Sequence, residues 1–209
     1  MNLSAHDDGA IIASVLAGDP GQFEQLVARY QSPLLRVALS RLGCHESADD
    51  VVQETFLCAF RSLHSYDSRY SFRTWLWTIL LNQCRRHYRK SRRRPEVTYD
   101  GIEFADGQNG ASPASHEVGP PAQLLAKEQG ELLQSMLDRL PEKQADALRL
   151  RFFGELKFQE IADAMGCSLS SAKNRVRWGL TKMSEMLTSE VYLWSGSCYQ
   201  NDDSRGDSP

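Results

Sequence analysis

Basic and aromatic side chains are interleaved over one stretch in the first half of the chain. Residues 61–94 carry 10 basic side chains and 1 acidic side chain. Cationic groups follow a phosphate backbone and aromatic rings stack on unpaired bases, so this combination is typical of proteins that bind single-stranded or melted nucleic acid. The candidate contacts are Tyr66, Arg69, Tyr70, Arg73, Trp75, Arg85, Arg86 and Arg89.

The same stretch also contains residues that fit the core of a helical domain. Phe72 and Trp75 lie at helical spacing, which favours burial for each of them and leaves the arginines as a solvated helix end. Tyr66, Tyr70 and Trp77 fit a core role less well, which favours the nucleic-acid interpretation of this stretch.

A second candidate site lies near the C-terminus, where residues 158–178 have the spacing of a helix-turn-helix. A short helix, a turn at Gly166 and Cys167, and a second helix place apolar residues of both helices against each other. The opposite face of the second helix can donate hydrogen bonds to phosphates and base edges in the major groove. Its candidate contacts are Ser170, Ser171, Lys173, Asn174, Arg175 and Arg177. The alternative is a helical hairpin with a solvated polar face.

Helices must position both sites, because apolar residues recur every three or four positions and no strand alternation is present. The sequence predicts an all-α protein of two small helical domains joined by a flexible linker, with the helix-turn-helix in the second. We expect the first domain at residues 1–94, an acidic linker rich in Pro and Gly at 95–121, the second domain at 122–188 and a disordered tail at 189–209. The expected helices span residues 23–42, 47–63, 72–94, 122–139, 141–153, 158–165 and 168–187.

Composition excludes several classes of protein. The chain has 209 residues, of which 41% are hydrophobic, with no apolar run near the roughly 20 residues that cross a bilayer. Its acidic N-terminus does not resemble a signal peptide, and its five cysteines have no CxxC pair. We therefore expect a cytoplasmic protein without membrane insertion, disulfide framework or metal site. Nucleophile, base and acid have no recognisable arrangement and no phosphate-binding glycine loop appears, so we expect no cofactor and no enzymatic activity.

Several ordered motifs connect these features to one family. They are residues 48–56 (ADDVVQETF), residues 72–76 (FRTWL), Leu140 with Pro141, residues 160–162 (EIA) and residues 168–175. In these motifs the chain resembles the extracytoplasmic-function sigma factors of bacterial RNA polymerase, which belong to the sigma-70 family. The resemblance covers roughly residues 22–94 and 137–187.

The resemblance implies a role for each site. Core RNA polymerase would bind the helix that carries Asp49, Asp50, Gln53, Glu54 and Phe56. The loop at residues 64–71 would capture a flipped base of the melted minus-ten element together with Asn82, supported by Trp75 and Arg73, with the arginines on its phosphates. The helix from Ser170 would read the minus-thirty-five element in duplex DNA. An anti-sigma factor is a further expected partner, and we expect a monomer when the protein is free.

Some residues depart from the family pattern, and two other functions stay open. Lys157 stands where the family has a Ser or Thr helix cap, Trp178 replaces a basic or polar residue, and Gly179 is a poor helix former. One alternative is a helix-turn-helix regulator that binds duplex DNA without joining the polymerase. The other is a scaffold or regulatory partner with a vestigial DNA-binding domain.

Overall fold

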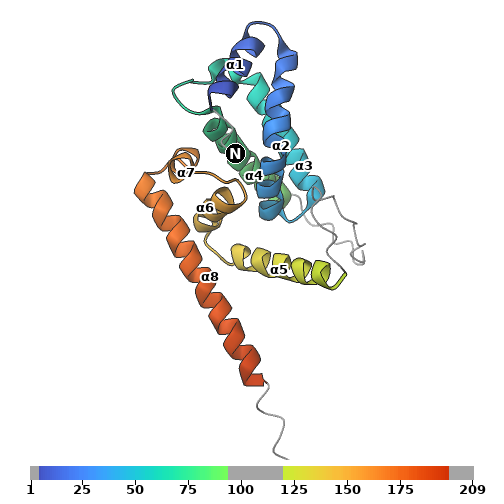
Figure 1. The fold of residues 1–209 in the computed structure, drawn as a ribbon, viewed down its shortest axis with the longest axis vertical. Coiled ribbons are helices and arrows are strands. Elements are labelled where there is room, and N and C mark those ends of the chain that lie inside the picture. Colours follow the sequence, from blue (N-terminus) through green and yellow to red (C-terminus); the bar gives the residue numbers. More distant parts are fainter. Residues whose placement is uncertain (1–4, 94–119, 198–209) are drawn as a thin grey trace, which may run out of the picture.

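The computed structural model describes residues 5–93 and 120–197, and these residues form helices, turns and loops without any strand (Figure 1). This confirms the all-α class. The helices are α1 (Ala5–Leu16), α2 (Phe23–Leu42), α3 (His45–Arg61), α4 (Phe72–Arg93), α5 (Pro120–Asp138), α6 (Glu142–Phe152), α7 (Phe158–Ala164) and α8 (Leu169–Ser197), with short 3-10 turns at Pro20–Gln22 and Leu63–Ser65.

The first domain is a bundle in which α2, α3 and α4 pack along one another. Leu26, Leu34 and Val37 of α2 are buried at its centre, as the apolar spacing predicts. The helix runs through Pro33 and ends at Gly43, whose φ of 70° lies in the left-handed region. Glycine adopts this conformation without steric cost, which is why α2 stops here.

Helix α1 was not among the predicted elements. Its apolar Ile11 and Ile12 are buried in the first domain, and Asp8 is buried as well. The carboxylate of Asp8 accepts a hydrogen bond from the Tyr30 hydroxyl and pairs with Arg29 of α2. These contacts anchor the helix beside α2 and α4.

Three helix ends differ from the expected ones. Helix α3 begins at His45, with Cys44 rather than Ser47 at its N-cap. Helix α5 begins at Pro120, inside the expected linker, whose remaining residues 95–119 lie outside the described part of the chain. Helix α8 continues to Ser197, so residues 189–197 are helical rather than part of a disordered tail. Residues 198–209 lie outside the described part as well.

In the second domain, α8 packs across α6 and α7. Gly179 of α8 lies directly against α6: a Cβ atom there would come within 2.8 Å of Leu148 Cδ1. This close approach gives a physical reason for a glycine inside the helix. Beyond the contact, α8 extends away from the rest of the molecule (Figure 1).

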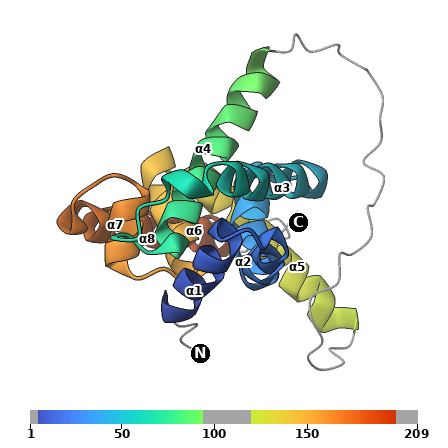
Figure 2. The ribbon, with the colours of Figure 1, turned by 90° about the horizontal axis from the view of Figure 1, so that it is seen from above.

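The two domains pack directly against each other. Helix α4 of the first contacts α7 of the second, and α2 contacts α6. The view in Figure 2 shows α6, α7 and α8 beside the lower part of α4, while the C-terminal end of α4 extends outward. One apolar core continues from one domain into the other. We call this contact surface the seam.

Candidate nucleic-acid interface and the seam between the domains

The acidic face of α3 is exposed. Asp49, Asp50, Gln53 and Glu54 all lie on the surface, while the valines between them are buried. Phe56 is different: only 8% of it is exposed and its ring meets Phe23 edge-on. The expectation that Phe56 offers a surface contact is therefore wrong, and the side chain supports α3 from within the bundle.

Two large apolar side chains extend the acidic face toward the end of α3. Leu57 is 47% exposed and Phe60 is 41% exposed. Leu57 follows Gln53 by one helical turn and Phe60 follows it by two, so both lie on the same side of α3 as Gln53. The sequence interpretation missed them, although their helical spacing from Gln53 could have indicated it.

The loop before α4 is built on a cluster of rings. Phe72 is buried at its centre, with ring centroids 5.9 Å from Tyr30, 5.8 Å from Tyr66 and 5.7 Å from Trp75. Tyr66 and Trp75 are half-buried and 5.3 Å apart. Such tilted and edge-on pairs hold their members in fixed orientations. Each of these two rings therefore keeps part of its surface exposed.

Polar contacts fix the tip of this loop. The Tyr66 hydroxyl donates a hydrogen bond to the Tyr70 carbonyl oxygen at 2.5 Å, and the Tyr70 ring is 58% exposed. Arg69 donates to Asp67, with Nε 3.0 Å from Oδ1 and Nη2 2.5 Å from Oδ2. These bonds lower the pKa of the Asp67 carboxyl. Arg69 is thus exposed but paired within its own loop.

Trp77 differs from the sequence interpretation, in which it fits a core role less well. Its side chain is completely buried at the seam. A Cβ atom added to Gly154 of the second domain would lie 3.2 Å from Trp77 Cη2, so the indole packs directly against that backbone. Trp77 is a core residue shared by the two domains.

The second domain also binds a candidate DNA contact of α4. Arg73 Nη2 donates to the carbonyl oxygens of Gly154 at 2.7 Å and Glu155 at 3.1 Å. Glu160 lies 3.9 Å from Arg73 Nη1. The carbonyl oxygens of the loop between α6 and α7 therefore accept hydrogen bonds from this guanidinium.

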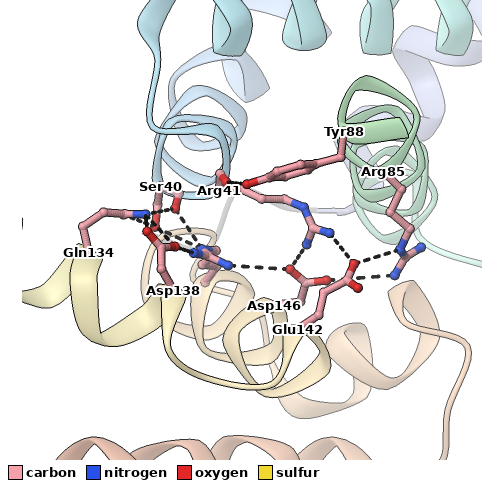
Figure 3. A network of polar contacts seen from close by, with 9 residues as sticks. Ser40, Arg41, Arg85, Tyr88, Gln134, Asp138, Glu142 and Asp146 are labelled. Atoms are coloured by element: carbon pink, nitrogen blue, oxygen red, sulfur yellow. Dashed lines mark hydrogen bonds and ion pairs between the residues drawn. The ribbon is translucent and has the colours of Figure 1, made fainter. Parts of the chain in front are cut away.

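A network of charged side chains closes the other end of the seam (Figure 3). Arg41 of α2 is buried, pairs with Asp146 of α6 and donates to Glu142 Oε1 at 2.6 Å. Arg149 donates to Asp138 at 3.0 Å and to the Ser40 carbonyl oxygen at 3.0 Å. Burial lowers the pKa of Arg149, Asp138 opposes this effect, and the charge of Arg41 adds to it.

Arg85 is the member of this network that the sequence assigns to DNA. Its Nε lies 3.7 Å from Glu142 and its Nη2 4.0 Å from Asp146, while Nη1 donates to Asn82 at 3.2 Å. Asn82, Arg86 and Arg89 are exposed on the same helix. The structure thus brings two sets of candidate contacts together at opposite ends of α4. The set at its N-terminal end is Tyr66, Arg69, Tyr70 and Trp75, and the set farther along the helix is Asn82, Arg85, Arg86 and Arg89.

The helix-turn-helix has the predicted form. Gly166 has a φ of 58° in the turn, and Ser168 caps α8 by accepting a hydrogen bond from the Ser171 N–H at 3.1 Å. At α7, Glu160 accepts a hydrogen bond from the Lys157 N–H at 2.7 Å and so compensates for the missing Ser or Thr cap. The polar face combines the exposed Ser170, Lys173 and Arg177 with the half-buried Ser171, Asn174 and Arg175.

The turn of this motif faces the aromatic loop of the first domain. A cavity of about 640 Å³ lies between them, lined by Tyr66, Tyr70 and Trp75 on one side and by Gly166 and Ser168 on the other. The aromatic loop and the turn of the helix-turn-helix therefore border the same cavity.

Comparison with known proteins gives a family to each domain. Residues 26–94 match Sigma-70 region 2, and residues 130–183 match Sigma-70, region 4. The ECF RNA polymerase sigma-E factor of Escherichia coli K12 is 32% identical over 171 residues, which cover 81% of this chain and 88% of that protein. The chain belongs to the extracytoplasmic-function sigma factors of the sigma-70 family. This sigma factor directs promoter-specific initiation of transcription by RNA polymerase.

Other relatives agree with the assignment. RNA polymerase sigma-H factor of Pseudomonas aeruginosa is 29% identical over 178 residues, covering 83% of this sigma factor and 90% of that protein. The solved structure of CnrH in complex with the cytosolic domain of CnrY has a TM-score of 0.64 and 25% identity, and covers 86% of this chain and 96% of CnrH. Among the helices that the structure describes, none has the length and apolar character needed to cross a membrane.

Proposed function

We propose that the two domains divide promoter recognition and polymerase binding as follows. The first domain, residues 1–94, binds core RNA polymerase through the exposed face of α3 and binds the minus-ten element through the aromatic loop and α4. The second domain, residues 122–188, reads the minus-thirty-five element with α8. The observation that carries this proposal is the separation of an acidic, partly apolar face on α3 from the basic and aromatic side chains of α4.

Chemistry supports each assignment. Asp50 and Glu54 can pair with basic groups of a partner while Leu57 and Phe60 supply apolar area, and interfaces commonly combine an apolar centre with a charged rim. Tyr66 and Trp75 offer partly exposed rings beside cations, which suits a strand with unstacked bases. Such a protein positions the polymerase on DNA without an enzymatic activity of its own, and we place it in the cytoplasm.

The partners of related proteins suggest one further partner. One solved relative is CnrH bound to the cytosolic domain of CnrY, and another is the sigma factor RpoE of Bartonella quintana bound to the anti-sigma factor NepR, at 22% identity and a TM-score of 0.59. We propose that an anti-sigma factor binds this chain as well. The free protein is a monomer in this proposal.

Run-off transcription tests the proposed function. Purified bacterial core polymerase with this protein is expected to initiate at members of a randomised promoter library that share two spaced elements, whereas core polymerase alone does not. Duplex binding by the protein alone without any initiation would instead support a helix-turn-helix regulator. No binding to DNA or polymerase would support the scaffold alternative.

Salt dependence tests the reading role of α8. The double variant Arg175→Ala with Arg177→Ala is expected to weaken duplex binding and to reduce the slope of log K against log salt by about 2, because each lost phosphate contact removes roughly 0.9. Fluorescence anisotropy between 50 and 200 mM salt measures the slope. Lys182→Ala is the matched control, because Lys182 lies farther along α8 and pairs with Glu185. Equal slopes for the double variant and the wild type would contradict the prediction that Arg175 and Arg177 contact phosphates.

A further inference from the structure

A second cavity lies at the seam, at the end away from the aromatic loop. Its volume is about 470 Å³ and its lining includes four arginines, namely Arg41, Arg85, Arg89 and Arg149. Arg41 belongs to α2, Arg85 and Arg89 belong to α4, and Arg149 belongs to α6 of the second domain. Figure 3 shows Arg41 and Arg85 near Glu142. We call this cavity the arginine pocket. Pockets of this size hold small molecules the size of a nucleotide.

Positive charge exceeds negative charge on the pocket wall. Only Asp138 and Glu142 add carboxylates to the lining, while the buried Asp146 pairs with Arg41 from outside it. Arg41 and Arg149 repel each other inside the seam. Burial lowers the pKa of Arg149, and the positive charge of Arg41 lowers it further. An anion in the pocket would relieve this repulsion.

Two of the four guanidiniums have donors to spare. Arg85 forms only long ion pairs with Glu142 at 3.7 Å and Asp146 at 4.0 Å, and its Nη1 donates a hydrogen bond to Asn82 at 3.2 Å. Arg89 makes no hydrogen bond or ion pair with any residue in the described part of the chain. A guanidinium carries five N–H donors in a planar fork that matches phosphate oxygens.

Helical geometry places these two guanidiniums on one face. Arg85 and Arg89 are four residues apart on α4, so their side chains are neighbours, and like charges at this spacing destabilise a helix unless something lies between them. Tyr88 completes the wall. Its hydroxyl donates to the Arg41 carbonyl oxygen at 2.8 Å, which fixes a half-exposed ring beside the two arginines.

We infer that the arginine pocket binds a phosphorylated small molecule of the nucleotide class. Its phosphates lie between Arg85 and Arg89, and its base lies against the ring of Tyr88. Because Arg41 and Arg149 line the same pocket from opposite sides of the seam, the bound anion also favours the packed arrangement of the domains.

Two exposed arginines of α4 give a matched pair of variants. Arg89 lines the pocket and Arg86 does not, although both are exposed and both belong to the proposed minus-ten surface. Isothermal titration of the full chain with ATP, at constant ionic strength and without phosphate buffer, is expected to detect binding. Arg89→Gln should weaken it by about tenfold or more, the loss expected for charge-assisted hydrogen bonds, whereas Arg86→Gln should change it by less than about twofold.

Variants of Tyr88, tested with ATP and with pyrophosphate, separate the contribution of the base to binding from that of the phosphates. Tyr88→Leu is expected to weaken ATP binding while pyrophosphate binding stays unchanged, and Tyr88→Phe keeps the ring and should bind ATP nearly as well. The inference is overturned if ATP, pyrophosphate and inorganic phosphate all fail to bind, or if Arg86→Gln weakens binding as much as Arg89→Gln. The second result would indicate diffuse attraction to a basic helix.

A competition experiment with DNA connects the arginine pocket to the proposed function. Of the experiments on the pocket, this one alone rests on the proposed function. Arg85 and Arg89 cannot bind a nucleotide and a minus-ten strand together, so ATP is expected to displace a labelled single strand from the wild type. If no single strand binds at all, the proposed minus-ten role fails while the direct titration still decides the pocket. If ATP and the strand bind together without competition, the pocket does not use the arginines of the DNA surface and the inference is wrong.

Discussion

Replacing Asp146 with alanine is expected to separate the two domains without unfolding them. Asp146 is only 1% exposed, pairs with Arg41, and lies 3.9 Å from Arg149 and 4.0 Å from Arg85. Its removal breaks the buried pair with Arg41 and leaves the partly exposed Glu142 as the remaining carboxylate partner of that guanidinium. Breaking a buried ion pair in this way costs about 3 kcal/mol or more. This cost falls on the packed arrangement, so its equilibrium constant should fall by roughly two orders of magnitude.

Small-angle scattering and tryptophan fluorescence measure this separation. The radius of gyration should rise and Trp77 should become accessible to a quencher, while far-ultraviolet circular dichroism keeps its helical signal. Asp163→Ala is the control, because Asp163 is exposed on α7 and accepts a hydrogen bond from Gln159 of the same helix. A variant with wild-type size and quenching would contradict the role of Asp146 in the seam.

Reversing two charges on α3 is expected to abolish productive binding to the polymerase. Asp50→Lys with Glu54→Lys should weaken the affinity for core polymerase by about 100-fold, because like charges facing each other across an interface cost several kcal/mol. Both residues are exposed, so the first domain should stay folded. Competition against a labelled sigma factor for core polymerase gives the affinity, and run-off transcription gives the consequence.

A charge reversal elsewhere on the same domain controls for net charge. Glu24→Lys changes an exposed acid in the first turn of α2, outside the proposed docking face, and should bind core polymerase normally. Leu57→Ala and Phe60→Ala are expected to add to the loss, since interfaces gain most of their energy from apolar centres. Unchanged affinity of the double lysine variant would contradict the proposal that α3 binds the polymerase.

Most helices of this protein could be predicted from the sequence because local signals define them. The apolar spacing of α2 and the glycine at 43 give the same boundary as the structure, and the helix-turn-helix follows from spacing around Gly166. Helix α1 escaped prediction because its burial depends on Asp8 reaching Arg29 and Tyr30, which are far away in sequence. Periodicity carries no information on such contacts.

The site was harder to predict where the two domains meet. Trp77 lies on the outer side of its own bundle, so a single-domain interpretation exposes it, whereas the loop at Gly154 covers it. Phe56 was assigned to the surface by resemblance, but its side chain completes the core beside Phe23. The network around Arg41 and Asp146 joins residues about 100 positions apart, and neither charge nor spacing indicates that pairing.

The hydrogen bonds from Arg73 to the second domain have a thermodynamic consequence for the proposed promoter binding. In the proposed function Arg73 contacts a DNA strand only in molecules whose domains have parted. The apparent dissociation constant then equals the intrinsic one divided by the parted fraction. If about one molecule in 100 is parted, affinity for the strand drops about 100-fold relative to the isolated surface. Whatever binds only the parted form, such as polymerase holding the domains at a distance, recovers that factor without adding any contact to DNA.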